Sequence, residues 1–291
     1  MTASDVTVII PARNRAHVLR AAVDSVLAQT APPAEIIVID DASTDDTAAV
    51  AEGLPVRLIR HVEAKGSGMA RNAGIDGATT GLVAFLDSDD EWLPDHLAYT
   101  VPQVDGHVLV TSPVIDTFGR LRGNTGGRRS TVRHDSLFFP ENVVCTSTVI
   151  ARRDALIAAG GFSDLPRAQD LDTWIRLLEH GSGIALPRPT ARYAVSEVYQ
   201  EPDLRRRSLA GAEVVRSQYD DAPWMTKRLQ DRIRTVRAWD DLRHAQRHRD
   251  LRQVLRSART LAAHGSTPSA LAELLSHRRR ARRRSATMDA P

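Results

Sequence analysis

Three carboxylates fall within four positions of this sequence, at Asp87, Asp89 and Asp90. They come directly after residues 82–86, an apolar run with the composition of a buried strand. Carboxylates this close together repel one another unless a cation lies among them. A hard divalent ion that has oxygen ligands and is shared with a diphosphate suits such a cluster. The sequence therefore predicts a protein that binds a nucleoside diphosphate through a metal ion.

Polar residues also follow the other strands that the apolar pattern predicts. Apolar runs indicate strands over residues 6–10, 35–39, 56–59 and 82–86, and the pattern between them indicates helices over residues 18–27, 44–51 and 69–76. Continuous apolar strands that alternate with helices are typical of a mostly parallel sheet with helices on both faces. Ligands bind at the carboxyl ends of such strands, beside the switch in strand order. We therefore expect Asn14, Asp41 and Asp89, which follow three different strands, to lie at one edge of the sheet.

The later part of the sequence is mixed and then helical. Residues 109–110 and 143–150 indicate further strands. The glycine-rich segment 119–129 between them indicates either a lid over the site or a plain surface insertion. From residue 202 onward the pattern is helical and rich in arginine, with a further helix predicted over residues 268–276.

The composition excludes several classes of protein. Cys145 is the only cysteine, so no internal disulfide forms and we interpret it as a structural residue in a predicted strand. The sequence lacks a signal peptide and any run near the roughly 18 apolar residues of a membrane helix. Arg71 stands where a dinucleotide fingerprint needs its third glycine, which excludes a Rossmann oxidoreductase. We therefore expect a cytoplasmic protein, with peripheral membrane contact left open.

Four ordered segments resemble the motifs of glycosyltransferase family two, whose members are inverting sugar transferases of the GT-A fold. The segments are residues 8–14, 37–47, 68–74 and 86–90. The resemblance implies an α/β catalytic domain with a Rossmann-like, mostly parallel sheet. It also implies a metal-assisted direct displacement, in which a sugar moves from a nucleoside diphosphate sugar, here a UDP-sugar, to an acceptor hydroxyl.

The resemblance assigns residues to the nucleotide sugar. They are Pro11, Ala12, Arg13, Asn14, Asp41, Lys65, Arg71, Asp87, Ser88 and Asp89. Asp87 and Asp89 form the DxD pair, in which Asp89 binds Mn²⁺ or Mg²⁺ and Asp87 faces the ribose or a metal-bound water. Asp41 accepts hydrogen bonds from the base. Arg13 stands where many relatives have an aromatic side chain, so a guanidinium face replaces base stacking.

A second signature concerns the acceptor. Residues 160–177 resemble the part of the family where an acidic pair opens a helix and its Asp is the general base. Here Gln169 replaces the first acid, and Asp170 is the implied catalytic base. Asp172 is the competing carboxylate, or these acids only cap a helix. Trp174 shapes the acceptor pocket or is a core residue.

The charge differs between the two ends of the chain. Residues 1–200 have 18 basic and 25 acidic side chains, a net charge of −7, whereas residues 201–291 have 21 and 11, a net charge of +10. We interpret the chain as a catalytic domain (1–200, with a nucleotide-binding half 1–110 and an acceptor half 111–200), a helical region (201–276) and a basic, disordered tail (277–291). The basic region suggests a homodimer, peripheral membrane contact or, with less support because it has few aromatics, nucleic-acid binding.

The main alternative enzyme is a sugar-1-phosphate nucleotidyltransferase. Such an enzyme needs a basic, glycine-rich loop directly after the first strand, and residues 11–15 are not one. Processive relatives carry membrane helices and a Gln-x-x-Arg-Trp signature, neither of which occurs here. We therefore expect a non-processive glycosyltransferase whose acceptor is a small molecule, a lipid-linked molecule or a glycan.

Overall fold

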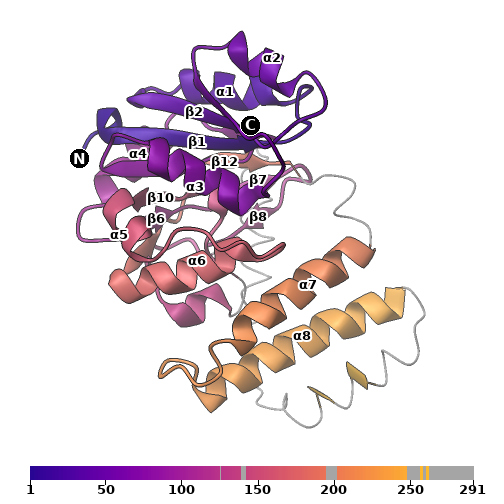
Figure 1. Cartoon of the computed structure of the whole chain (residues 1–291). Helices are drawn as coiled ribbons and strands as arrows, with labels where there is room; N and C mark the ends of the chain where they lie inside the picture. Colours follow the sequence, from indigo (N-terminus) through magenta and orange to yellow (C-terminus); the bar gives the residue numbers. More distant parts are fainter. Residues whose placement is uncertain (125, 139–141, 195–201, 248–255, 258–259, 262–291) are drawn as a thin grey trace.

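The computed structural model describes residues 1–124, 126–138, 142–194, 202–247, 256–257 and 260–261. An eight-stranded sheet with the order β3-β2-β1-β4-β10-β6-β11-β9 forms its centre, and a four-stranded sheet, β5-β12-β7-β8, lies beside it. Figure 1 shows the helices packed around these sheets, with α7 and α8 side by side next to α6. The expected mixed α/β fold with a helical C-terminal region is confirmed.

The first half of the chain builds the parallel part of the large sheet. Its strands are β1 (Val6–Ala12), β2 (Glu35–Asp40), β3 (Arg57–Arg60) and β4 (Leu82–Phe85), and its helices are α1 (Leu19–Leu27), α2 (Thr47–Glu52) and α3 (Ser67–Gly77). β1 pairs in parallel with β2 on one side and with β4 on the other. The apolar runs of the sequence therefore predicted these strands to within two residues at each end.

The switch in strand order lies between β1 and β4. From β1 the chain moves outward to β2 and β3, then returns to place β4 on the other side of β1. Pairing between β1 and β4 ends at Ile9 and Phe85, whereas β1 continues to Ala12. Pro11, which has no N–H to donate, lies beyond the point where β4 diverges. The two strands thus separate at their carboxyl ends, where ligands bind in sheets of this type.

The second half of the chain completes both sheets. The strands are β5 (Glu91–Trp92), β6 (Leu109–Thr111), β7 (Val114–Asp116), β8 (Leu121–Arg122), β9 (Ser130–Val132), β10 (Ile150–Arg152), β11 (Gly183–Ala185) and β12 (Ala191–Tyr193). The helices are α4 (His96–Thr100), α5 (Arg153–Ala158) and α6 (Gln169–Leu177), with 3₁₀ turns η2 (Val101–Gln103), η3 (His134–Leu137), η4 (Thr146–Thr148) and η5 (Leu178–His180). A further 3₁₀ turn, η1 (Ala3–Asp5), precedes β1. β10 is antiparallel to both β4 and β6, so the sheet is mostly but not wholly parallel.

Apolar side chains fill both faces of the large sheet. On one face Val8 and Ile10 pack with the buried stripe of α1, and on the other Ile9 packs with α3. On the second face Trp174 of α6 is fully buried, with its ring centroid 6.1 Å from that of Phe85. Burial on both faces explains why the strands are continuously apolar.

The C-terminal helices pack against α6 and against Phe138. These are α7 (Pro202–Ser217) and α8 (Lys227–Arg247). Leu229 and Ile233 of α8 form a small core with Phe138 and Trp224.

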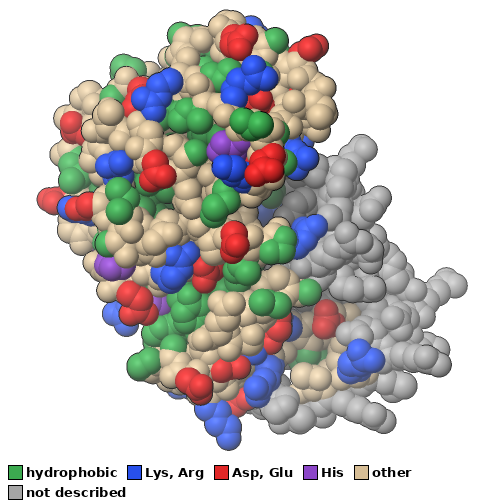
Figure 2. Space-filling view, in the orientation of Figure 1, with side chains coloured by type: hydrophobic (Ala, Val, Ile, Leu, Met, Phe, Trp, Pro, Cys, Tyr) green, Lys and Arg blue, Asp and Glu red, His purple; other side chains and the backbone are tan. Residues whose placement is uncertain are grey.

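Acidic and basic side chains are interspersed over the described part of the face in Figure 2. None of the described helices is long and apolar enough to span a bilayer. The predicted helix 268–276 and the tail 277–291 lie outside the described residues.

One expectation differs from the structure. Residues 143–150 do not form one strand, because Thr146–Thr148 is a 3₁₀ turn and Cys145 precedes it. The Thr148 hydroxyl donates to the Cys145 carbonyl at 2.9 Å, a local bond that competes with strand pairing. The segment 119–129 contains β8, which pairs with β7.

His96 of α4 is a buried residue that packs on Trp92. Its ring is fully buried and stacks on Trp92 with centroids 4.2 Å apart, and its Nδ1 is 2.7 Å from Thr190 Oγ1. Trp92 Nε1 donates to the Ser147 carbonyl at 2.6 Å. Burial lowers the pKa of His96 to about 3, so this imidazole is neutral in the folded protein.

His96 should make folding sensitive to acid. Its pKa is lower in the folded chain than in the unfolded chain, so its stabilisation is complete above about pH 6.5 and is lost as the pH falls toward about 3. We expect His96→Phe to reduce the dependence of Tm on pH between about pH 4.5 and 6.5, measured by thermal unfolding. The exposed control His180→Gln should not. An unchanged pH dependence in His96→Phe would contradict this account.

Candidate active site

The turns that follow β1 and β2 are joined by hydrogen bonds. The Asn14 N–H donates to Ser43 Oγ at 2.9 Å, and Asn14 Oδ1 accepts from the Thr44 N–H at 2.9 Å. Asn14 and Ala42 have φ angles of 54° and 56°, which are uncommon outside glycine and mark constrained turns. The two turns therefore form one continuous surface at the carboxyl edge of the sheet, with Arg13 exposed on it.

The carboxylate of Asp41 is buried and bound by three groups. Its Oδ1 accepts from the Lys65 N–H at 2.8 Å and lies 2.7 Å from His61 Nδ1, and its Oδ2 accepts from the Gly66 N–H at 2.8 Å. Burial acts to raise the pKa of Asp41, but the hydrogen bonds from Lys65, His61 and Gly66 hold it below its ordinary value. Asp41 is therefore ionised at neutral pH and fastens the segment between β3 and α3 to the end of β2.

Arg71 of α3 contacts Asp87 at the end of β4. Arg71 Nη2 lies 2.5 Å from Asp87 Oδ1, and Arg71 is only 5% exposed. Its Cζ lies 5.3 Å from the ring centroid of Phe162, so the guanidinium packs between an aromatic ring and a carboxylate. Arg71 thus offsets part of the negative charge of the cluster. Because Arg71 is buried, its guanidinium contacts Asp87 and is not exposed at the edge of the sheet.

The carboxyl groups of Asp89 and Asp90 both have raised pKa values. Burial and the charge of Asp87 raise the pKa of Asp89, and Arg15, whose Nη2 is 3.9 Å from Asp89 Oδ2, offsets this only in part. Asp90 is 1% exposed, and burial together with Asp87 raises its pKa to about 8. Its Oδ2 accepts from the Ser147 hydroxyl at 2.5 Å. A bound cation would relieve this excess of negative charge.

Two consecutive residues of η4 connect this cluster to Asp170. Ser147 Oγ, which donates to Asp90, also accepts from the Asp87 N–H at 3.2 Å. The adjoining Thr146 hydroxyl donates to Asp170 Oδ2 at 3.3 Å. Asp170 therefore lies beside the carboxylates that follow β4, although the two are far apart in the sequence.

The first turn of α6 also contacts the first turn of α3. Gln169 Nε2 donates to Ser67 Oγ at 2.7 Å. A side chain at Gly68 would place its Cβ 2.8 Å from the Ser163 carbonyl oxygen, so this approach of the two segments requires glycine. Gln169, which replaces an acid of the family signature, thus joins the start of α6 to the start of α3.

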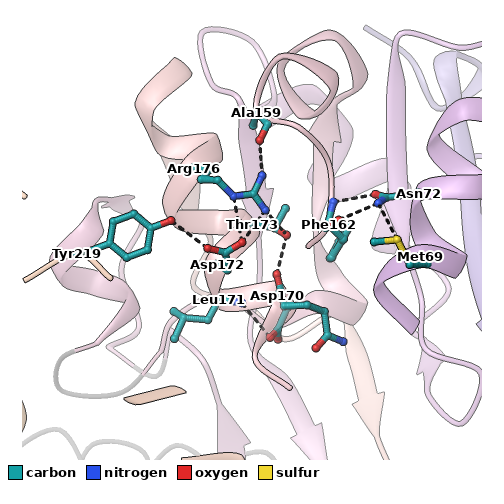
Figure 3. Close-up of polar contacts among 11 residues, drawn as sticks. Met69, Asn72, Ala159, Phe162, Asp170, Leu171, Asp172, Thr173, Arg176 and Tyr219 are labelled. Atoms are coloured by element: carbon teal, nitrogen blue, oxygen red, sulfur yellow. Dashed lines mark hydrogen bonds and ion pairs between the residues drawn. The ribbon is translucent and has the colours of Figure 1, made fainter. Parts of the chain in front are cut away.

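Asp172 and Trp174 have structural positions. Figure 3 shows the Asp172 carboxylate between Arg176 Nη2, at 2.7 Å, and the Tyr219 hydroxyl, at 3.0 Å. Asp172 is 5% exposed, whereas Asp170 is partly exposed. Asp172 is therefore held by its partners, which leaves Asp170 as the accessible carboxylate of this helix. Of the two alternatives for Trp174, an acceptor-pocket residue or a core residue, its fully buried side chain favours the core residue.

The donor set suits a cation that is shared with phosphate. No group of three or more His, Cys, Asp or Glu side chains among the described residues is arranged to hold a metal ion. Asp87 and Asp89 nevertheless offer hard oxygen ligands in a place where burial and mutual repulsion raise the pKa of Asp89. Mg²⁺ at nucleotide sites is commonly held by one or two carboxylates and completes its shell with water and phosphate oxygens. The residues fit that arrangement.

The structure gathers the residues assigned to the nucleotide sugar at one edge, with different exposure. The exposed ones are Arg13, Asn14 and Lys65, the partly exposed ones are Asp87 and Asp89, and the buried ones are Pro11, Ala12, Asp41, Arg71 and Ser88. The sequence analysis missed three residues of this edge, His61, Thr146 and Ser147. His61 could have been found, because it lies two residues after the end of the third predicted strand.

The chain belongs to glycosyl transferase family 2, whose model matches residues 7–159. That span covers just over half of the chain. It includes the turns after β1, β2 and β4 and the residues of η4, whereas Asp170 lies beyond it.

Several curated proteins resemble this chain. It is 41% identical over 104 residues to succinoglycan biosynthesis protein ExoO of Rhizobium meliloti, which covers 35% of this chain and 30% of that protein. It is 31% identical over 199 residues to pre-mycofactocin glycosyltransferase of Mycobacterium tuberculosis, a match that covers 61% of this chain and 40% of that protein. It is 39% identical over 95 residues to UDP-Glc:alpha-D-GlcNAc-diphosphoundecaprenol beta-1,3-glucosyltransferase WfgD of Escherichia coli, a match that covers 32% of this chain and 38% of that protein. The matches thus span 30–40% of the length of these relatives.

Solved structures of TarS from S. aureus share the fold. TarS 1–349 in complex with UDP-GlcNAc superposes with a TM-score of 0.62 at 19% identity, over 78% of this chain and 70% of that one. Its complex with UDP gives 0.59 at 21% identity, over 78% and 69%. At this identity the likeness concerns the fold alone, which is the GT-A fold.

Replacing Ser147 tests the connection through η4. Ser147→Ala removes the hydroxyl that donates to the buried Asp90 carboxylate. We expect the free energy of unfolding to fall by about 1–3 kcal/mol, because a buried polar group loses its partner. Urea denaturation measures this, and Ser217→Ala on the exposed side of α7 should change it by less than about 0.5 kcal/mol. If the free energy of unfolding falls equally in the two variants, the Ser147–Asp90 hydrogen bond does not stabilise the fold.

Proposed function

We infer that this protein transfers a sugar, with inversion, from a nucleoside diphosphate sugar to an acceptor hydroxyl. One observation carries the proposal. Thr146 and Ser147 bond to Asp170 and to the Asp87–Asp90 turn respectively, so a candidate base and the candidate donor-binding carboxylates share one site. Membership of glycosyl transferase family 2 supports the same reaction class.

The proposed donor is a UDP-sugar. WfgD, which resembles this chain, carries UDP-Glc in its name, and the TarS structures that share the fold hold UDP or UDP-GlcNAc. In this chain the exposed side chains of Arg13 and Asn14 would contact the base and ribose. Asp41 already receives three hydrogen bonds, so it supports the base-binding wall and has one acceptor position left for the base.

Asp89 and Asp87 would hold the divalent ion, Mn²⁺ or Mg²⁺. When bound, such an ion offsets the negative charge that develops on the departing diphosphate. Arg15, near Asp89, and Arg71, on Asp87, keep the two carboxylates in place and limit their repulsion. Lys65 is exposed at the same edge and can approach the nucleotide without rearrangement of the fold.

Asp170 would act as the general base. Its carboxylate takes the proton of the acceptor hydroxyl as the oxygen attacks the anomeric carbon from the side opposite the leaving diphosphate. The Thr146 hydroxyl and the Leu171 N–H, at 2.9 Å, orient the carboxylate. The proposed acceptor is a hydroxyl of a glycan or of a lipid-linked sugar, the latter because WfgD is named for a diphosphoundecaprenol-linked sugar.

A thermal-shift measurement tests the donor site. We expect UDP to raise Tm, and Mn²⁺ to increase that shift, because a ligand that binds only the folded state stabilises it. Asp89→Ala should abolish the contribution of Mn²⁺, whereas Asp76→Ala, at an exposed position of α3, should retain it. Equal Mn²⁺-dependent shifts in wild type and Asp89→Ala would remove Asp89 from the metal site.

A second pair of variants tests the base. Asp170→Asn should keep the UDP-dependent rise in Tm. It should transfer the sugar of a UDP-sugar to water, or to an acceptor found by screening, at least about 100-fold more slowly, measured as release of UDP. Asp164→Asn, exposed in the loop before α6, should keep its rate. Near-normal turnover in Asp170→Asn would show that another group takes the proton.

A further inference from the structure

A groove with a volume of about 560 Å³ lies between the end of β9 and the start of α8. Arg133, His134 and Asp135 line one side of it, and Arg228 and Arg232 line the other. We call it the β9–α8 groove. Its volume falls within the range of small-molecule binding sites, about 300–1,000 Å³.

Strand register places the β9–α8 groove at the opposite sheet edge from the candidate active site. Val132 at the end of β9 pairs with Gly183 at the start of β11, which pairs with Leu109 at the start of β6. β6 runs in the same direction as β4, because both are antiparallel to β10. The residues after Val132 therefore lie at the amino ends of these strands, whereas Asp41 and Asp87 follow carboxyl ends. The groove is separate from the carboxyl-edge site.

Positive charge collects in the groove. Arg133, Arg228 and Arg232 line it together with a single acidic residue, Asp135. Burial lowers the pKa of Arg232, the like charge of Arg228 lowers it further, and Asp135 offsets only part of this. Within the described part of the chain, neither Arg133 nor Arg228 takes part in an ion pair. An anion in the groove would relieve the repulsion.

The remaining lining is apolar and aromatic. Leu178, Leu229 and Trp224 contribute to it. Trp224 stacks on His134 with centroids 4.4 Å apart, and Glu179 Oε1 lies 3.1 Å from His134 Nε2 and accepts from Trp224 Nε1 at 3.3 Å. Glu179 thus contacts both rings of this stacked pair and helps to hold them in place. Such a wall suits a ligand with a carbon body and not a bare ion.

We propose that the β9–α8 groove is a second binding site, for a sugar-sized molecule that carries a phosphate or carboxylate group. Guanidinium groups bind both anions through paired, charge-assisted hydrogen bonds. Arg228 and Arg232 are one turn apart on α8, and Arg133 belongs to a different element, so the anion is held from two sides. This inference does not rest on the proposed function, because the groove shares no residue with the carboxyl-edge site.

Calorimetric titration of the full chain at low ionic strength tests the proposal. Saturating UDP is present throughout to occupy the nucleotide site. The probes are glucose 1-phosphate, glucuronate and, as the neutral control, glucose. We expect saturable binding of one or both charged sugars and none of glucose, and the tighter of the two identifies the preferred anion. Absence of saturable binding for both charged sugars would overturn the proposal.

Matched variants assign that binding to the groove. Arg228→Gln combined with Arg232→Gln, and separately Arg133→Gln, should weaken it about tenfold or more, as expected for lost hydrogen bonds to a charged group. Arg234→Gln is the control, because Arg234 lies on the same helix, outside the groove lining, 3.5 Å from Asp231. Thermal unfolding without probe verifies that each variant folds. Unchanged affinity in both groove variants, or an equal loss in Arg234→Gln, would overturn the assignment.

Discussion

Negative charge held at one edge of a buried sheet is the constraint on which this structure depends. β4 delivers Asp87, Asp89 and Asp90 to its carboxyl end, and burial together with mutual repulsion raises the pKa of the last two. Protein groups offset only part of the negative charge of Asp87 and Asp89: Arg71 contacts Asp87, and Arg15 lies near Asp89. A divalent cation would supply the remainder, and a cation with few protein ligands binds phosphate readily. This charge balance supports the proposal that the edge binds a nucleotide diphosphate together with a cation.

The same edge also explains why distant segments converge. The turn after β1 is hydrogen-bonded to the turn after β2, and Asp41 accepts a hydrogen bond from the segment before α3. η4 then joins the carboxylates after β4 to the first turn of α6. These contacts are hydrogen bonds between short polar segments, which have no hydrophobic face of their own. They depend on the buried strands to hold their ends in register, so the apolar core fixes the geometry of the polar site.

Much of this could be predicted from the sequence, and the exceptions have physical causes. Strands buried on both faces leave continuous apolar runs, so β1 to β4 were visible, and with them the edge where Asp41 and Asp89 lie. Thr146 and Ser147 were not visible, because uncharged polar residues in a 3₁₀ turn leave no periodic signal and resemble a strand. Trp174 could not be placed from sequence alone, since the packing of α6 decides which side chains face the core. The Asp172–Arg176 pair, by contrast, had the i, i+4 spacing of a helical ion pair.

The central claim is that acidic side chains from neighbouring strand ends bind one divalent ion bridged to a nucleotide diphosphate. Anomalous diffraction from crystals of the full chain grown with UDP and Mn²⁺ tests it most directly. The account predicts a manganese peak within coordination distance of the Asp89 carboxylate, with a diphosphate oxygen as another ligand and the uracil beside Arg13 and Asn14. Manganese bound away from Asp89, or UDP bound at another edge of the sheet, would contradict it.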